Sequence, residues 1–187
     1  MRASSGIWDR LVAARGAPNV DGMPVTSQLP ETAVQRAFRG AMGQVTSSVS
    51  VVTTLTDGVP HGTTVSAFMS LSMDPPMLTF ALDRGSNLLA RLGVGSVVGV
   101  NVLAAHHDQI ALRFAGKGDD KFADVPWRVE NGAPALHDRH AWVALRLSQL
   151  VEAGDHVLLI GDVTGADATP SAPLTYWKRT FGTHQTF

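Results

Sequence analysis

The chain has 187 residues and a formal net charge of −1, with 44% hydrophobic residues and no cysteine. This length predicts one domain, large enough to bury a core without help from disulfides. A near-neutral charge gives no electrostatic basis for binding nucleic acid or an anionic membrane, and we expect neither partner. The lack of cysteine excludes thiol nucleophiles, iron–sulfur clusters and Cys-ligated zinc.

The N-terminal stretch is predicted to be a flexible extension. Residues 1–28 mix Gly, Pro, Ser and Asn, and their apolar run at Leu11–Ala14 is far shorter than a secretory signal or a membrane span requires. We therefore expect residues 1–28 to be flexible and residues 29–187 to form the folded domain. We also expect the protein to be cytoplasmic.

Short strands dominate the rest of the chain, with small helices between them. Apolar residues at helical spacing predict a helix within Pro30–Val45, and we expect two more over Ser86–Leu92 and His106–Ala115. Apolar and β-branched runs predict strands, in chain order, over Val49–Thr56, Val59–Ser66, Met77–Leu82, Val97–Leu103, Trp142–Ala153 and His156–Gly165. This order indicates a β-barrel or sandwich with peripheral helices rather than alternating βαβ units.

Two familiar kinds of site are not supported by the sequence. Gly93–Gly99 has GxGxxxG spacing and leads into a strand, whereas a dinucleotide-binding loop joins a strand to a helix. The histidines include the adjacent pair His106 and His107, which point in different directions on a helix, and no HExxH occurs. We therefore expect neither a Rossmann loop nor a metal site.

The segment GTTVSAFMSLSMDPP, residues 62–76, combines small hydroxyl side chains with a rigid double proline. Small hydroxyl residues on a strand let a flat ring approach the backbone, and they offer O–H and N–H donors to its polar edge. The same residues are also common where the edge of a strand faces water. Taken alone, the segment leaves both interpretations open.

Six segments, in order along the chain, carry a resemblance to a known family: FRGAMGQVTSSVSVVTT, HGTTVSAFMSLSMDPPMLTFAL, VGVNVL, QIALRFAGKGDDKF, AGDHVLLIGDV and PLTYW. Over residues 34–182 the chain resembles the flavin reductase family, the FMN-binding split barrel of two-component monooxygenases. The resemblance implies a mainly β fold, a Greek-key split β-barrel with peripheral α-helices, and a homodimer. It also implies reduction of FMN or FAD by NADH or NADPH, with the reduced flavin passing to a separate monooxygenase.

The same resemblance implies which residues bind the cofactors. The flavin ring would lie against Thr64, Val65, Ser66, Ala67 and Phe68. A flavin phosphate or ribityl group would lie near Ser86 and Asn87, and matching segments place Asn101, Gln109, Lys121 and Phe122 near the flavin as well. His156, in the GDH segment, would lie near the nicotinamide and position its carboxamide, because hydride transfer needs no general base.

Structural alternatives exist for several of these residues. Ser86 also suits a plain helix N-cap, and Lys121 also suits a solvated surface position. Asn101 would also fit as a buried polar residue with local partners, and His156 as a turn residue. The segment Val45–Ser48 departs from the family, which has Pro and Gly at this point.

Two other functions stay open at this point. One is a split-barrel flavoprotein that holds FMN tightly and catalyses another redox step. The other is a non-catalytic relative that binds flavin or haem.

Overall fold

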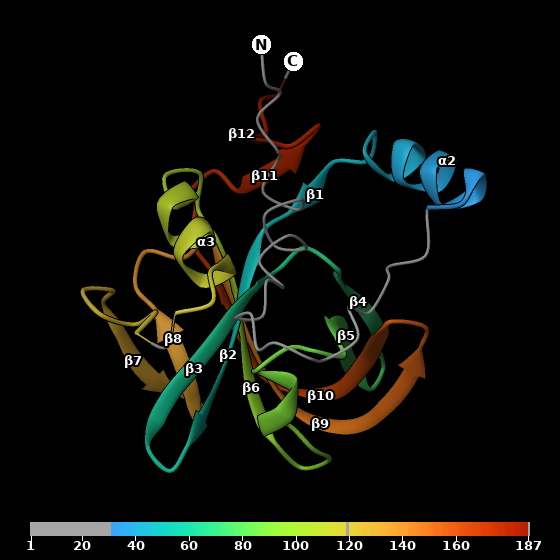
Figure 1. Cartoon of the computed structure of the whole chain (residues 1–187). Coiled ribbons are helices and arrows are strands. Elements are labelled where there is room, and N and C mark those ends of the chain that lie inside the picture. The colour runs from blue at the N-terminus through green and yellow to red at the C-terminus, as the bar shows by residue number, and fades with distance from the viewer. Residues whose placement is uncertain (1–30, 119, 187) are drawn as a thin grey trace, which may run out of the picture.

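A computed structural model describes residues 31–118 and 120–186 of the chain. The extension predicted over residues 1–28 lies outside these residues. In chain order the described elements are α2 (Ala33–Met42), β1 (Ser47–Ser48), β2 (Ser50–Thr56), β3 (Val59–Val65), β4 (Phe68–Met73), β5 (Pro76–Asp83), the 3-10 helix η1 (Leu89–Arg91), β6 (Val97–Val102), α3 (Asp108–Ala115), β7 (Trp127–Glu130), β8 (Ala133–Leu136), β9 (Ala141–Ala153), β10 (His156–Ala168), β11 (Leu174–Trp177) and β12 (Thr180–Thr183) (Figure 1). The predicted mainly β class is confirmed.

The central sheet is antiparallel and has the strand order β3-β2-β6-β9-β10-β5-β4. Its two edges, β3 and β4, follow each other in the chain and are joined only by Ser66 and Ala67. The sheet must therefore roll until its edges meet at these two residues. No ladder pairs β3 with β4 in the part of the chain that the structure describes, so the roll is a barrel split along one seam.

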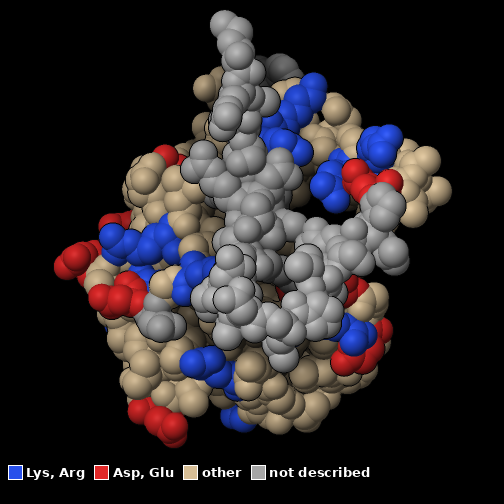
Figure 2. Space-filling view, viewed as in Figure 1, with Lys and Arg blue, Asp and Glu red and all other residues tan. Residues whose placement is uncertain are grey.

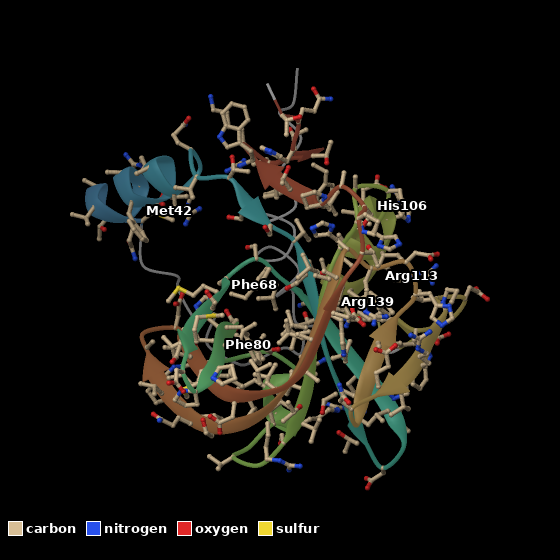
Figure 3. The ribbon with its side chains drawn as sticks, turned by 180° about the vertical axis from the view of Figure 1, so that it is seen from behind. Met42, Phe68, Phe80, His106, Arg113 and Arg139 are labelled. Atoms are coloured by element: carbon tan, nitrogen blue, oxygen red, sulfur yellow. The ribbon has the colours of Figure 1, made fainter. Side chains whose placement is uncertain are left out.

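The crossing between β5 and β6 gives the roll its Greek-key character. These strands are consecutive in the chain, yet β9 and β10 lie between them in the sheet. The inside of the roll is filled by one buried cluster that includes Val52, Phe80, Val98, Leu145 and Leu159, and Phe68 packs against it (Figure 3). A second cluster lies under α3 and β11 and includes Val51, Leu103, Phe114, Leu136 and Leu174.

Helix α2 stands apart from the sheet (Figure 1). It begins at a capping box in which Thr32 Oγ1 accepts from Gln35 N and Gln35 Oε1 accepts from Thr32 N. The predicted apolar stripe is present, but Val34 and Phe38 are 77% and 66% exposed and no residue of the helix is buried. The stripe therefore faces no core among the described residues of this chain.

A hairpin formed by β7 and β8 was not predicted and changes the surroundings of β9. Its turn is Asn131-Gly132, with φ of +44° and +83°, as a type I′ turn requires. Ala133 and Ala135 of the hairpin pack against Trp142 and Ala144 of β9 in a small buried cluster. In the sequence, Val143, Leu145 and Leu147 alternate with Ala144, Arg146 and Ser148, which predicts a half-exposed strand. This prediction is wrong for Ala144, which is buried because the hairpin covers its face of β9.

Two predicted helices are shorter than expected. The helix expected over Ser86–Leu92 is a single 3-10 turn at Leu89–Arg91, and the helix expected from His106 begins at Asp108. The PLTYW segment contributes β11, which pairs with β1 and β12 in a three-stranded sheet. No helix in the described ranges is long and apolar enough to cross a membrane.

Candidate functional site

The segment that the sequence singled out lies at the seam of the barrel. Ser66 and Ala67 join the two edge strands, Ala67 is exposed, and Ser66 is partly exposed. Ala67 O accepts from Ala81 N at 2.9 Å, which fixes the start of β4 against β5. The Ser66 side chain has no hydrogen bond to any other residue that the structure describes. A short stretch of backbone with small side chains is thus accessible where the edges meet.

A row of residues on the outer face of the sheet continues from this seam. In antiparallel pairs, opposed residues point to the same face, and Phe68 opposite Phe80 points into the core. Ala67 and Ala81, one position further along each strand, therefore point outward. Leu158 lies opposite Ala81 on the next strand. The small Ala67 and Ala81 side chains leave a flat strip of surface beside the seam.

Asp83 and His156 mark the end of this strip. They lie opposite each other in the β5–β10 ladder, two residues beyond Ala81 and Leu158, and so share the outer face. The His156 side chain is 44% exposed, and its Nδ1 lies 2.8 Å from Asp155 Oδ1. The fold thus brings His156 to the same face as Ala67, although 89 positions in the sequence separate them.

The loop after β5 lies next to His156. Arg84 N donates to Asp155 O at 3.0 Å, which ties this loop to the turn before His156. Ser86 Oγ accepts from Leu89 N at 3.4 Å, which ties Ser86 to the first residue of the 3-10 turn. The Asn87 side chain is exposed and has no hydrogen bond within the described residues. We call Ser66, Ala67, Ser86, Asn87 and His156 the seam site. Ser66 and Ala67 lie at the seam itself, and the loop that carries Ser86 and Asn87 is tied to the turn before His156.

Four other predicted residues lie on the opposite side of the seam, around α3. Thr64 Oγ1 donates to Ala111 O at 2.7 Å. Lys121 Nζ donates to Phe114 O at 2.9 Å and to Gly62 O at 3.3 Å. Gln109 is exposed and donates to Asp108 Oδ2 at 3.0 Å, and the Phe122 ring meets Phe114 edge to face at 4.8 Å. Thr64, Lys121 and Phe122 therefore join α3 and its following loop to the barrel.

The remaining predicted residues belong to the interior. Val65 is 5% exposed and lies in the cluster inside the roll, so that only its backbone reaches the seam. Asn101 has no exposed surface, and its amide forms hydrogen bonds to Val51, Thr53, Pro134 and Leu136. Since these internal bonds use the Asn101 amide, we do not include Asn101 in the seam site.

Two arginines that the sequence reasoning did not single out flank Ser86 and Asn87. Arg84 Nη2 pairs with Glu152 Oε2 at 2.5 Å, and Arg91 Nη1 donates to Asn87 O at 2.7 Å. The run DRGSNLLAR contains both arginines. Two cations on either side of a hydroxyl and an amide are a pattern from which an anion-binding loop could have been predicted. Elsewhere on the face shown in Figure 2, positively and negatively charged side chains lie close together. One example is at α2, where Arg36 and Arg39 pair with Glu31.

The chain is similar to several known proteins. Residues 42–185 match the flavin reductase like domain. The chain is 31% identical over 172 residues to an NADH:FMN oxidoreductase of Rhodococcus erythropolis, covering 88% of this chain and 90% of the relative. It is 34% identical over 145 residues to the reductase component of a 4-nitrophenol 4-monooxygenase/4-nitrocatechol 2-monooxygenase of Rhodococcus opacus, covering 78% of each.

A solved structure is similar as well. The NADH:FAD oxidoreductase SgcE6 of Streptomyces globisporus C-1027, in complex with NAD and FAD fragments, superposes with a TM-score of 0.76 and 26% identity, covering 83% of this chain and 96% of that one. The fold and these similarities define an oxidoreductase of the flavin reductase class. The chain belongs to the flavin reductase like domain family.

Proposed function

We propose that this chain reduces FMN or FAD with NADH or NADPH and supplies the reduced flavin to a separate flavin-dependent monooxygenase. The observation that carries the proposal is the seam site, where an accessible strip of backbone at Ser66 and Ala67 lies on the same face as His156. The relatives support the two halves of the proposal, since one is named an NADH:FMN oxidoreductase and another the reductase component of a monooxygenase. We place the reaction in the cytoplasm, where reduced nicotinamide dinucleotides are available.

The residues present fit a flavin. A flat ring needs a surface without bulky side chains, and Ala67 and Ala81 provide one beside the seam. The ring's polar edge needs hydrogen-bond partners, which Ser66 Oγ and the neighbouring backbone supply. A phosphate needs donors and positive charge, and the Asn87 amide between Arg84 and Arg91 suits that need.

Little chemistry is then required of the side chains. When bound, the flavin accepts the hydride from the nicotinamide and supplies the reactivity. The strip at Ala67 orients the ring, the loop at Ser86 and Asn87 holds the charged tail, and His156 orients the carboxamide of the nicotinamide. None of these residues has to transfer a proton, so their contribution is binding and alignment.

A homodimer is part of the proposal. The stripe on α2, with Val34, Phe38 and Met42 between 49% and 77% exposed, is an apolar face that packs against no core within residues 31–118 and 120–186. Met69 and Met73 on the edge strand β4 are 58% and 83% exposed and provide further apolar surface. Surfaces of this kind mark association sites, and a second copy of the chain presents the same two surfaces.

Steady-state kinetics test the reductase activity. We expect the purified chain to consume NADH or NADPH only when FMN or FAD is added, with saturation in the flavin. Replacing Ala67 by Leu fills the strip and should raise the KM for flavin about tenfold, on the scale of a steric clash of roughly 1–3 kcal/mol. The control Ala168→Leu adds the same atoms at the exposed far end of β10 and should change nothing.

The same experiments include results that would refute the proposal. If neither dinucleotide is consumed with either flavin, the reductase activity does not exist. If flavin instead stays with the protein through gel filtration and added free flavin does not speed turnover, the flavin is a resident group and the chain does not supply it to a partner.

The dimer has its own test. Phe38→Asp puts a charge in the middle of the α2 stripe and should convert the protein to a monomer in light scattering. Arg36→Asp puts the same charge on the opposite face of α2 and should leave the dimer intact. A wild-type protein that is monomeric at micromolar concentration would contradict this part of the proposal.

A further inference from the structure

We propose that Asp155 is a positioning residue that fixes the tautomer of His156 and thereby makes the enzyme prefer a carboxamide over a carboxylate on the nicotinamide ring. The inference rests on the proposed function of the seam site. Its basis is the 2.8 Å contact between His156 Nδ1 and Asp155 Oδ1. An ionised carboxylate only accepts hydrogen bonds, so the neutral imidazole in this contact carries its proton on Nδ1.

The tautomer decides what the exposed side of the ring offers. With the proton on Nδ1, Nε2 has a lone pair and accepts a hydrogen bond. The His156 side chain is 44% exposed, so part of this ring is available to a ligand on the outer face of the sheet. A carboxamide presents an N–H donor to such an acceptor, whereas a carboxylate presents only further lone pairs.

The backbone around Asp155 is held in place although its side chain is 91% exposed. Gly154 and Asp155 form a two-residue turn between the paired Ala153 and His156, and Gly154 has φ +66°, as the first residue of a type II′ turn does. Arg84 N donates to Asp155 O at 3.0 Å. The carboxylate thus starts from a fixed position next to the ring, which favours the observed contact.

The tautomer is measured directly by NMR. Long-range nitrogen–proton correlation of the imidazole rings, at about pH 8 where an ordinary imidazole is neutral, should show His156 protonated on Nδ1 in the full-length protein. Asp155→Ala should shift the ring toward protonation on Nε2. Asp162→Ala removes an exposed carboxylate further along β10 and should leave the His156 signals unchanged. An Nε2-protonated ring in the wild type would overturn the inference.

Kinetics then test the consequence. Asp155→Ala should raise the KM for NADH about threefold to tenfold, the scale of one hydrogen bond, with kcat within about twofold. Wild type should use reduced nicotinic acid adenine dinucleotide, which carries a carboxylate in place of the carboxamide, less well than NADH, and Asp155→Ala should narrow this preference. In a His156→Ala background, Asp155→Ala should change neither the KM for NADH nor the preference between the two dinucleotides any further.

Two kinetic results would overturn the inference. One is an Asp155→Ala variant that keeps the full preference for NADH. The other is an Asp155→Ala substitution that raises the KM for NADH as much in the His156→Ala background as in the wild type. A wild-type protein that oxidises no NADH would instead refute the proposed function and with it the nicotinamide preference, while the ring spectra still decide whether Asp155 sets the tautomer.

Discussion

Replacing Asn101 by Ala separates a structural role from a flavin-binding role. Its Nδ2 donates to Val51 O at 3.0 Å and lies 3.3 Å from Thr53 Oγ1 and 3.4 Å from Pro134 O. Its Oδ1 accepts from Leu136 N at 2.7 Å, and Asn101 and Leu136 are both fully buried. The substitution leaves the Leu136 N–H without its side-chain acceptor, which costs about 1–3 kcal/mol.

The missing atoms leave a small cavity in addition, so we expect a total loss of about 2–4 kcal/mol in the free energy of unfolding. For a chain of this length that corresponds to a fall in Tm of roughly 4–16 °C. Thermal unfolding followed by circular dichroism measures it, and the KM for flavin, assayed well below the transition, should match wild type.

Asn87→Ala is the matched comparison, because it deletes the same group from an exposed position in the seam site. We expect it to raise the KM for flavin and leave Tm within about 2 °C, the size of a surface substitution. Our reasoning is refuted if Asn101→Ala keeps its Tm while the KM for flavin rises, since Asn101 would then contact the cofactor.

Three further substitutions test the fold. A Cβ on Gly99 would lie 1.9 Å from Cη2 of Trp142, so Gly99→Ala should cost at least about 1–3 kcal/mol in urea unfolding; an unchanged midpoint would contradict this packing. Burial lowers the pKa of His107, with a further lowering from His106 and an opposing effect of Asp138. The folded state then binds a proton less readily than the unfolded state, so stability falls as the pH drops below about 6.5. His107→Leu should lose less stability than wild type between about pH 8 and about pH 5, and an equal loss would exclude His107 as the cause. Arg139 is 6% exposed, with Nη2 at 2.7 and 2.8 Å from two carboxylates. Arg139→Met should therefore cost about 1–3 kcal/mol, because Glu130 loses its partner while Asp167, which is 51% exposed, stays hydrated. An unchanged free energy of unfolding would show that Arg139 and its two carboxylates are not needed for stability.

Local sequence patterns were sufficient to predict the main strands. β2, β5, β6, β9 and β10 lie within a few residues of their predicted bounds, because apolar and β-branched residues dominate these runs. Asn131-Gly132 is a strong local signal for a hairpin turn, and without the hairpin the face of β9 that carries Ala144 looks exposed. The helix expected over Ser86–Leu92 is not present, because so short a run sustains only one 3-10 turn, at Leu89–Arg91.

The candidate site was predictable in part. The family resemblance predicted the seam segment and His156 as site residues, and the structure places Ala67 and His156 on one face of the barrel. Thr64 and Lys121 could not be assigned from sequence, because a hydroxyl or an ammonium group binds a helix carbonyl as readily as a cofactor.

The sequence by itself determined the main strands, β2, β3, β5, β6, β9 and β10, and showed that residues 62–76 combine small hydroxyl side chains with a double proline. The tertiary structure alone decided that this segment joins the two edges of one rolled sheet, and that His156 reaches the same face by pairing with Asp83. The physical reason is that side-chain periodicity shows only that one face of a strand is more apolar than the other. What covers that face, and which distant strand lies beside it, depends on how the whole sheet curls.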